Sequence, residues 1–370
     1  MPFSKLTGDE FSQRIGSWLT QSGPDSDVVV SCRVRLARNV AGYPFMVRLK
    51  EQRAAELSRT LRHALELALA GGGERIWVDI PQASPLERLL LRERHLVSRD
   101  HAPIEKPDRG QEGRAVAFDS GETVAVMVNE EDHLRLQGLA GGFDLDLARE
   151  RVTRVDQSLE GQVDFAFSER LGYLTACPTN VGTGMRASVM LHLPALGLVR
   201  SELEKVFSAA QRTGLAVRGM YGEGSRAAGD FYQLSNQVTL GREESALVDD
   251  LQALVPCVID FERKVREALL ESRRDPLRDR VMHSIGMLSN ARALPTEVAL
   301  QHLSNLRLGA SLSLMDDLTP GDVDALAVRI QKGHVQACFG EPEDSELLDA
   351  SERDRLRASF LRQHLKKDPS

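Results

Sequence analysis

The order of apolar and polar residues predicts a chain whose first part mixes strands with helices. Residues 27–36 read DVVVSCRVRL, and their alternation places Arg33 and Arg35 on one face of a strand, with Val34 and Leu36 on the other. Further strands or extended segments are predicted at residues 75–80, 115–118, 123–128, 173–176, 217–223 and 231–240. Apolar residues at helical spacing predict helices at residues 9–20, 52–70, 85–97, 144–159 and 201–213.

The sequence pattern changes near residue 243, beyond which strand-like runs disappear. Leu, Ala, Glu and Arg dominate there, and their spacing predicts helices at residues 244–272, 276–290 and 296–303, with more towards the C-terminus. We therefore predict an α+β domain at residues 1–255, followed by an all-α domain at residues 256–370.

Composition excludes several classes of protein. With 370 residues, 42% of them hydrophobic and 27% charged, the chain can bury a large core, which excludes disordered, collagen-like and small disulfide-stapled proteins. No apolar run approaches the roughly 20 residues that cross a bilayer, and the N-terminal stretch is too polar for a signal peptide. We therefore expect a cytoplasmic protein that does not bind membranes.

Net charge and cysteine spacing bear on nucleic-acid binding, disulfide formation and metal binding. The net charge is −7 and no long basic run occurs, which argues against nucleic acid as the main partner. Cys32, Cys177, Cys257 and Cys338 lie far apart, without a CxxC pair or metal-ligand spacing. We therefore expect neither a disulfide framework nor a zinc site.

Arginines on strand-like or glycine-flanked segments are the main chemical feature. The sequence holds no GxxxxGKS/T loop, no GxGxxG after a strand, no HExxH and no GxSxG. Arginine matches phosphate oxygens with two parallel hydrogen bonds, so arginines converging from several strands would hold a triphosphate without such a loop. A single arginine usually lies solvated or ion-paired on the surface, but two on one strand face repel each other unless an anion or acid lies opposite. The candidates are Arg33, Arg35, Arg135, Arg186 and Arg218.

The acidic candidates are Glu130, Glu131 and Asp132 after a predicted hairpin, and Glu223 in a glycine-rich segment. A carboxylate pair would orient a cationic substrate and accept its proton, although a solvated acidic turn fits the same residues. Cys177 is either a reactive thiol near cations or a small buried residue. The residues alone leave both alternatives open.

Five collinear motifs resemble the ATP:guanidino phosphotransferase (phosphagen kinase) family. They occur in the order and spacing of that family over roughly residues 25 to 255, so the resemblance is specific. The motifs are SCRVRLAR at 31–38, NEEDHLR at 129–135, CPTN and GTGMRAS between 177 and 188, RG and GE between 218 and 223, and SN at 235–236.

Within that family the chain resembles the bacterial protein-arginine kinases. Only about 25 residues come before the region of this resemblance, so we expect no counterpart of the helical domain that precedes the catalytic domain in the metabolic enzymes. Their SNKRR stretch reads SNQVT at residues 235–239, which removes three cations and favours the protein-directed branch. Cys32 is a departure, because the family commonly has a small hydroxyl residue there.

The resemblance implies a fold and a mechanism. The fold class is α+β, with a phosphagen-kinase-like catalytic domain, an antiparallel sheet flanked by helices, followed by an all-α C-terminal domain. Glu131 and Glu223 would grip the acceptor guanidinium and accept its proton, while Cys177 helps to orient it. ATP and Mg²⁺ are the implied cofactors, with Mg²⁺ held mainly by the nucleotide and not by a protein metal site. The implied nucleotide-binding residues are Ser31, Cys32, Arg33, Val34, Arg35, His95, Arg135, Arg186, Ala187, Ser188, Val189, Met190, Arg218, Gly219, Met220, Tyr221 and Gly222.

A C-terminal stretch resembles a further motif of the protein-arginine kinases. RDRLRA at residues 353–358 fits their RDxxRA motif, which implies an allosteric phosphoarginine site with Arg353 and Arg357 on the phosphate and Asp354 on the guanidinium. As bare sequence, the same stretch is a charged helix whose two arginines, at i,i+4 spacing, fit a solvated face.

The expected function is transfer of the γ-phosphate of ATP to arginine side chains of proteins, which marks them for Clp-type proteolysis in protein quality control. The resemblance implies protein substrates with exposed or unfolded arginines, an activator protein and a Clp-type protease as partners, and a homodimer or larger homo-oligomer. One alternative is a small-molecule guanidino kinase. Another is a catalytically silent phosphoarginine-binding adaptor, against which the presence of both Glu131 and Glu223 argues.

Overall fold

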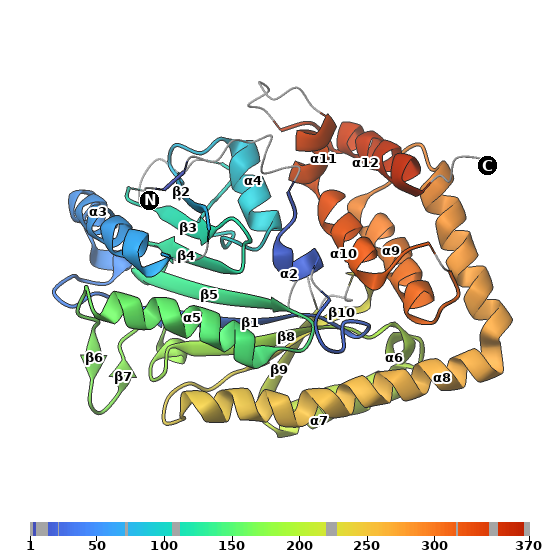
Figure 1. Ribbon diagram of the computed structural model, residues 1–370, viewed down its shortest axis with the longest axis horizontal. Helices are drawn as coiled ribbons and strands as arrows, with labels where there is room; N and C mark the ends of the chain where they lie inside the picture. Colours follow the sequence, from blue (N-terminus) through green and yellow to red (C-terminus); the bar gives the residue numbers. More distant parts are fainter. Residues whose placement is uncertain are drawn as a thin grey trace.

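The computed structural model places one sheet at the centre of the molecule, with helices on both faces (Figure 1). It describes residues 3–4, 14–20, 22–70, 73–105, 112–219, 228–315, 317–339 and 347–365. The mixed α+β class expected from the sequence is confirmed. No helix within those ranges combines the length and the hydropathy that crossing a bilayer requires.

Eight antiparallel strands form the sheet in the order β2-β3-β4-β5-β1-β8-β10-β9. The first strand in the chain is therefore central, since it pairs with β5 on one side and β8 on the other. The strands are β1 (Val29–Arg38), β2 (Arg75–Asp79), β3 (Ala115–Asp119), β4 (Val124–Val128), β5 (Leu134–Gly141), β8 (Met185–His192), β9 (Leu215–Gly219) and β10 (Phe231–Asn236). A separate hairpin pairs β6 (Phe167–Ser168) with β7 (Gly172–Tyr173).

One face of the sheet carries the main hydrophobic core. Val34 and Leu36 of β1 point into it, as the alternation in the sequence predicts. Burying each such side chain stabilises the fold by about 1.5–3 kcal/mol relative to leaving it exposed. The helices that cover this face are α3 (Glu51–Ala68), α5 (Leu145–Glu160), α7 (Arg200–Arg212) and the first half of α8 (Glu244–Asn290).

The other face is covered only at its two sides. Helix α4 (Pro85–Glu93) packs on β2, β3 and β4, where it encloses a smaller core. Helices α9 to α12 are here called the C-terminal helices. Of these, α9, α10 and α12 share a core with the second half of α8, while α11 contacts α12 and α4. The C-terminal helices are α9 (Thr296–Ser311), α10 (Pro320–Arg329), α11 (Lys332–Phe339) and α12 (Ala350–Leu365). The short helices α2 (Ser17–Thr20) and α6 (Pro194–Leu198) contact them.

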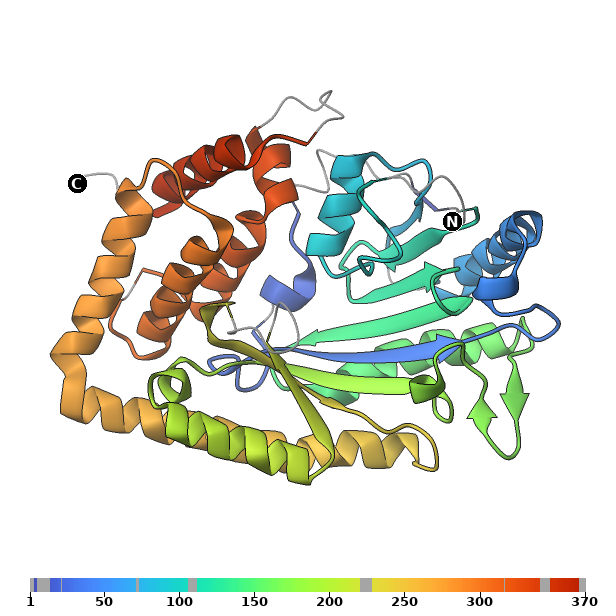
Figure 2. The same ribbon diagram turned by 180° about the vertical axis from the view of Figure 1, so that it is seen from behind.

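Helix α8 joins the sheet to the C-terminal helices without a linker. The two helices expected at 244–272 and 276–290 form one element that bends at Arg273 (φ −144°, ψ 40°), where Pro276 provides no backbone N–H (Figure 2). Residue 255, our expected domain boundary, lies within this helix, and Val258 still packs in the core of the sheet. The division at that residue stays a prediction.

The N-terminal helix is shorter than the sequence predicts. Of the expected helix at residues 9–20, only Ser17–Thr20 is helical, and residues 9–13 lie outside the described residues. Trp18 and Leu19 of this turn are buried against Leu139 of β5. Their contact fixes the turn on the less covered face of the sheet.

Asp230 makes stability depend on pH, because it is largely buried beside α9. Burial raises its pKa to about 6, against the opposing effect of a hydrogen bond from Gln301 Nε2 (3.5 Å). The folded state therefore keeps a proton that an unfolded aspartate loses near pH 4, so stability falls as the pH rises from about 4 to about 6. Asp230→Asn should be about 1–3 kcal/mol more stable than the parent at pH 7 and no more stable at pH 3.5. Urea unfolding at both pH values checks this, and an equal gain at both would contradict it.

Candidate active site

Arginines from three neighbouring strands meet on the less covered face of the sheet. Arg33 and Arg35 alternate with core residues along β1. The strand register places Arg35 directly opposite Arg186 of β8, while Arg135 of β5 lies opposite Ala37. Because like charges repel across neighbouring strands, this face is suited to an anion.

A cavity of about 670 Å³ lies over Arg33, Arg35 and Arg135, and its volume is typical of ligand sites. Its walls come from the sheet, from α4 and the segment after it, from α2, and from the C-terminal helices. Of the predicted nucleotide-binding residues, those that line it are Ser31, Arg33, Arg35, His95, Arg135, Ser188 and Met190.

The arginine side chains that line the cavity are close enough to repel one another. Burial and the nearby Arg135 lower the pKa of Arg33 to about 10, and burial with three neighbouring arginines lowers the pKa of Arg35 well below its usual value. Within the described residues, Arg35 Nε is buried without a hydrogen-bond partner. Burial and Arg33 lower the pKa of His95 to about 4, so its imidazole is neutral at pH 7. A polyanion would relieve this repulsion and accept the free donor.

Glu130 holds Arg135 in place. Both of its carboxylate oxygens accept hydrogen bonds from the guanidinium, at 3.2 and 2.9 Å, and Ser98 donates to the same carboxylate. Burial alone would raise the pKa of Glu130, but Arg135 and the hydrogen bonds hold it below its usual value. Glu130 is thus a fixed counter-charge that positions one phosphate-binding candidate.

The turn after β4 exposes Glu131 and buries its neighbours. Asn129 adopts a left-handed conformation (φ 60°) and donates to the carbonyls of Ala54 and Gly113, both at 3.0 Å. Partial burial and the neighbouring Asp132 and Glu130 raise the pKa of Glu131. A carboxylate of raised pKa that stays accessible is suited to accepting a proton.

Asp132 ties this turn to the loop that carries Cys177. Its Oδ1 accepts hydrogen bonds from Asn39 Nδ2 (2.6 Å) and from the backbone N–H of Ala176 (2.7 Å). Glu131 directly precedes Asp132 in the chain, and Cys177 directly follows Ala176. Asp132 therefore sets the position of two of the three predicted catalytic residues, Glu131 and Cys177.

Replacing Asp132 by alanine should lower kcat by about 100-fold, because small displacements of reacting groups cost about that much. Asp132→Asn keeps an oxygen acceptor for Asn39 and Ala176, so it should retain most of the activity. Steady-state kinetics of both variants, with urea unfolding to compare their stabilities, checks this. Equal losses in both variants would show that the carboxylate charge matters rather than the geometry.

Cys177 and Arg186 share one polar neighbour. Thr179 Oγ1 lies 3.1 Å from Cys177 Sγ and accepts a hydrogen bond from Arg186 (3.0 Å), which also donates to Asn180 Oδ1 (3.1 Å). Burial, Arg218 and Arg135 lower the pKa of Arg186, whereas Cys177 and Glu131 act in the opposite direction. The predicted acceptor-binding and phosphate-binding residues thus lie within electrostatic range of one another.

Several predicted nucleotide-binding residues have side chains that face away from the cavity. These residues are Cys32, Val34, Ala187 and Val189, whose side chains lie in the main core. Only their backbone can contact a ligand above the arginines. Burial also raises the pKa of the Cys32 thiol, which makes it an unreactive core residue.

The glycine-rich segment after β9 is only partly described. Arg218 lies opposite Gln233, which lines the cavity, and Gly219 ends the strand. Met220, Tyr221, Gly222 and Glu223 lie outside the described residues. The predicted role of Glu223 as second carboxylate stays a prediction.

Arg357 of the C-terminal motif is buried. The interpretation of this stretch as a solvated helix face is therefore wrong at this position. It donates to the carbonyls of Ile330 and Leu294, both at 2.7 Å, and to Asp354 Oδ1 at 2.6 Å. Arg353 and Asp354 are half-buried. Arg357 therefore fastens α12 to the neighbouring helices, and phosphoarginine binding by the motif stays a prediction.

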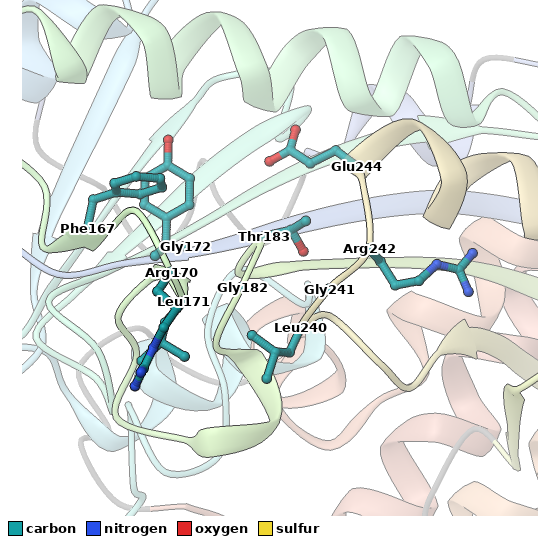
Figure 3. Close-up of a pocket in the computed structure, with 11 residues that line it drawn as sticks. Phe167, Arg170, Leu171, Gly172, Gly182, Thr183, Leu240, Gly241, Arg242 and Glu244 are labelled. Carbon is teal, nitrogen blue, oxygen red and sulfur yellow. The ribbon is translucent and has the colours of Figure 1, made fainter.

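A smaller pocket of about 310 Å³ lies at the base of the Cys177 loop (Figure 3). Two backbone hydrogen bonds between Tyr173 and Gly182, of 2.8 and 3.3 Å, close this loop at its base. Arg38 stacks on the Tyr173 ring (3.5 Å to the centroid) and pairs with Asp156 (2.7 Å). Figure 3 shows Phe167 on one side of the pocket and Leu240 on the other. The residues around this pocket support the base of the loop. None of them lines the larger cavity over Arg33, Arg35 and Arg135.

Gln137 and the C-terminal side of the cavity were missed by sequence reasoning. Gln137 of β5 lies opposite Arg35 and donates to the carbonyl of His95 (2.7 Å). Period-two alternation from Arg135 would have found it, had β5 been predicted. Among the described residues, no group of three or more His, Cys, Asp or Glu could hold a metal ion.

Comparison with known proteins agrees with this geometry. Residues 57–265 match the family described as ATP:guanido phosphotransferase, C-terminal catalytic domain. The chain belongs to this family. Residues 274–370 match the protein-arginine kinase McsB C-terminal domain, which places the chain in the McsB-type branch of the ATP:guanido phosphotransferases.

Similar relatives span nearly the whole chain. A protein-arginine kinase of Moorella thermoacetica is 42% identical and covers 95% of this chain and 98% of its own length. The protein-arginine kinase of Bacillus subtilis is 40% identical, covering 95% of this chain and 93% of its own length.

Solved structures show the ATP:guanido phosphotransferase fold. A duplicated taurocyamine kinase of Schistosoma mansoni, with bound transition-state-analogue components, matches with a TM-score of 0.56 and 25% identity, over 70% of this chain and 38% of that one. A lombricine kinase matches with a TM-score of 0.56 and 24% identity, over 72% of this chain and 73% of that one, and this likeness concerns the fold alone.

Proposed function

We propose that the chain is a protein-arginine kinase, which transfers the γ-phosphate of ATP to arginine side chains of proteins. The observation that carries this proposal is the arginine-lined cavity, one end of which lies beside Arg135 and the turn of Glu131. The cationic cluster suits a triphosphate, and the exposed carboxylate suits a guanidinium. Mg²⁺, bound mainly by the nucleotide, would neutralise part of the charge on the phosphates.

The reaction must remove a proton as the phosphoryl group arrives, because a guanidinium has a pKa above about 12 and its nitrogens are not nucleophilic. Glu131 binds the acceptor guanidinium and takes the proton, which its raised pKa favours. The N–P bond forms as the bond between the γ-phosphorus and the bridging oxygen of ADP breaks. Alignment of the reacting atoms contributes about 7–11 kcal/mol in favourable cases.

The arginines stabilise the transferring group. Arg35, Arg135 and Arg186 stand on adjacent strands, where their donors can reach the oxygens of one phosphate chain. Glu130 keeps Arg135 oriented before substrate arrives, so little reorganisation is needed during transfer. Glu223 is proposed as the second carboxylate on the guanidinium and Cys177 as a further orienting group.

The acceptor is proposed to be a protein side chain because the Glu131 side chain is exposed. An arginine displayed on an unfolded or flexible segment could reach it. We further propose a cytoplasmic enzyme that acts as a homo-oligomer, answers to an activator protein and marks its substrates for a Clp-type protease.

The test offers the purified protein two acceptors with Mg·ATP, an unfolded arginine-rich protein and free arginine. Mass spectrometry without acid treatment preserves the N–P bond. Phosphoarginine on the protein supports the proposal. Product on free arginine alone would indicate a small-molecule guanidino kinase, and binding of phosphoarginine peptides without any product would indicate a silent adaptor.

A further inference from the structure

The two ends of the large cavity differ in chemistry. At one end, Arg35 and Arg135 supply charge. The other end carries apolar side chains from three parts of the molecule, beside polar side chains of the C-terminal helices such as Thr296, Asp324 and Gln331. The sheet supplies Val30, Leu139, Met190 and Phe231, helix α2 supplies Trp18 and Leu19, and the C-terminal helices supply Leu300, Ala327 and Val328. A ligand that fills this cavity needs an anionic part joined to a flat or apolar part.

The C-terminal helices contact the catalytic sheet at the apolar end. Val328 of α10 packs against the cluster of Trp18, Leu19 and Leu139, and so lies against both α2 and strand β5. The ring of Trp18 lies 6.5 Å from that of His95, a predicted nucleotide-binding residue. This end of the cavity therefore adjoins the path expected for the nucleotide.

Arg307 of α9 holds this wall in position. It pairs with both oxygens of Asp324 in α10 at 2.8 and 3.1 Å, and Asp324 itself lines the cavity. The same guanidinium donates to the carbonyls of Ser26 and Asp27, both at 2.8 Å, just before β1. The wall is thus tied to the strand that carries Arg33 and Arg35.

We propose that the C-terminal helices form one wall of the base-binding end of the nucleotide cavity, with Val328 and Leu300 packing against the nucleobase. The inference rests on the proposed function, because it takes ATP as the ligand. Aliphatic side chains contact the face of a flat heterocycle through burial and dispersion, without reading its edge. By linkage, a nucleotide that touches both parts of the molecule also strengthens the contact between them.

The test compares Val328→Phe with Val298→Phe, in which the same change falls on an exposed residue of α9 away from the cavity. Calorimetry with Mg²⁺ uses two probes, ATP and inorganic tripolyphosphate, which has no base. Val328→Phe should raise the Kd for ATP about 10-fold by overpacking the base-binding end, and leave the Kd for tripolyphosphate within about twofold. Val298→Phe should change neither.

A milder variant keeps the test decisive if phenylalanine disturbs folding. Val328→Ala should raise the Kd for ATP about threefold, through lost contact area alone. Equal weakening of ATP and tripolyphosphate, or no change in either, would overturn the proposal. A parent protein that binds both probes equally tightly would also overturn it, because the base would then add nothing. A protein that binds ATP as expected but phosphorylates no protein would sink the proposed function and leave this inference standing.

Discussion

Glutamine in place of Glu131 should lower kcat for protein phosphorylation by about 1,000-fold, while the KM for ATP changes little. The amide keeps the size of the side chain but can neither accept the proton nor pair with the guanidinium. The arginines proposed to bind phosphate lie on β1, β5 and β8, and this substitution does not alter them. Single-turnover kinetics with an unfolded arginine-rich protein, with phosphoarginine quantified by mass spectrometry, measures the transfer step directly.

The pH profile gives this prediction a second readout. Because the pKa of Glu131 is raised, activity of the parent should increase with pH through a limb that lies above the ordinary glutamate range of about 4.3. Glu131→Gln should lose that limb. Glu169→Gln, which changes an exposed carboxylate on the β6–β7 turn, serves as the control and should keep parental rates. Parental rates in Glu131→Gln would remove the residue from the mechanism.

Replacing Arg307 by methionine should destabilise the fold by about 3–5 kcal/mol, a large fraction of the stability of an ordinary domain. Arg307 is 0% exposed, and besides Asp324 it contacts His192 Nδ1 at 3.1 Å. Its removal leaves the buried Asp324 carboxylate and the Ser26 carbonyl without this donor, whereas the Asp27 carbonyl keeps hydrogen bonds from Arg266. Urea unfolding followed by circular dichroism measures the loss.

A surface pair provides the matched control for Arg307. Arg154 pairs with Glu150 at 2.6 Å, but both side chains are mostly exposed, so Arg154→Met should cost less than about 1 kcal/mol. The double variant Arg307→Met with Asp324→Leu should recover part of the lost stability, because it removes the uncompensated charge. Similar losses for Arg307→Met and Arg154→Met would contradict the assigned role.

The alternation of apolar and charged residues predicts β1 and its two faces, because one face packs in the core and the other borders the cavity. Val34 enters the core while Arg33 borders the cavity, so the alternation is clean. Strands β5 and β8 are harder to detect. They read LRLQGLAG and MRASVMLH, in which small and polar residues interrupt the apolar run. Their strand conformation follows from lying on either side of β1, which is a tertiary effect.

Only the residues of the candidate site that lie within the sequence motifs could be predicted. The resemblance indicates the arginines and Glu131 as site residues. The strand register then explains how the arginines of β1, β5 and β8 come together. It does not reveal that Glu130 is committed to Arg135 or that Arg357 is buried. The partners of Arg357 include carbonyls 27 and 63 positions away along the chain, beyond the range of any helical spacing rule.

The central place of β1 has a consequence for the nascent chain. Val29–Arg38 leaves the ribosome before both of its partner strands, so it cannot complete its pairing until Leu134–Gly141 and Met185–His192 have followed. At ordinary rates of synthesis, both edges of this strand stay open for about 10 s. Charged side chains on an open strand oppose association with other chains. By this argument, Arg33 and Arg35 would disfavour such association before the cavity that they line has formed.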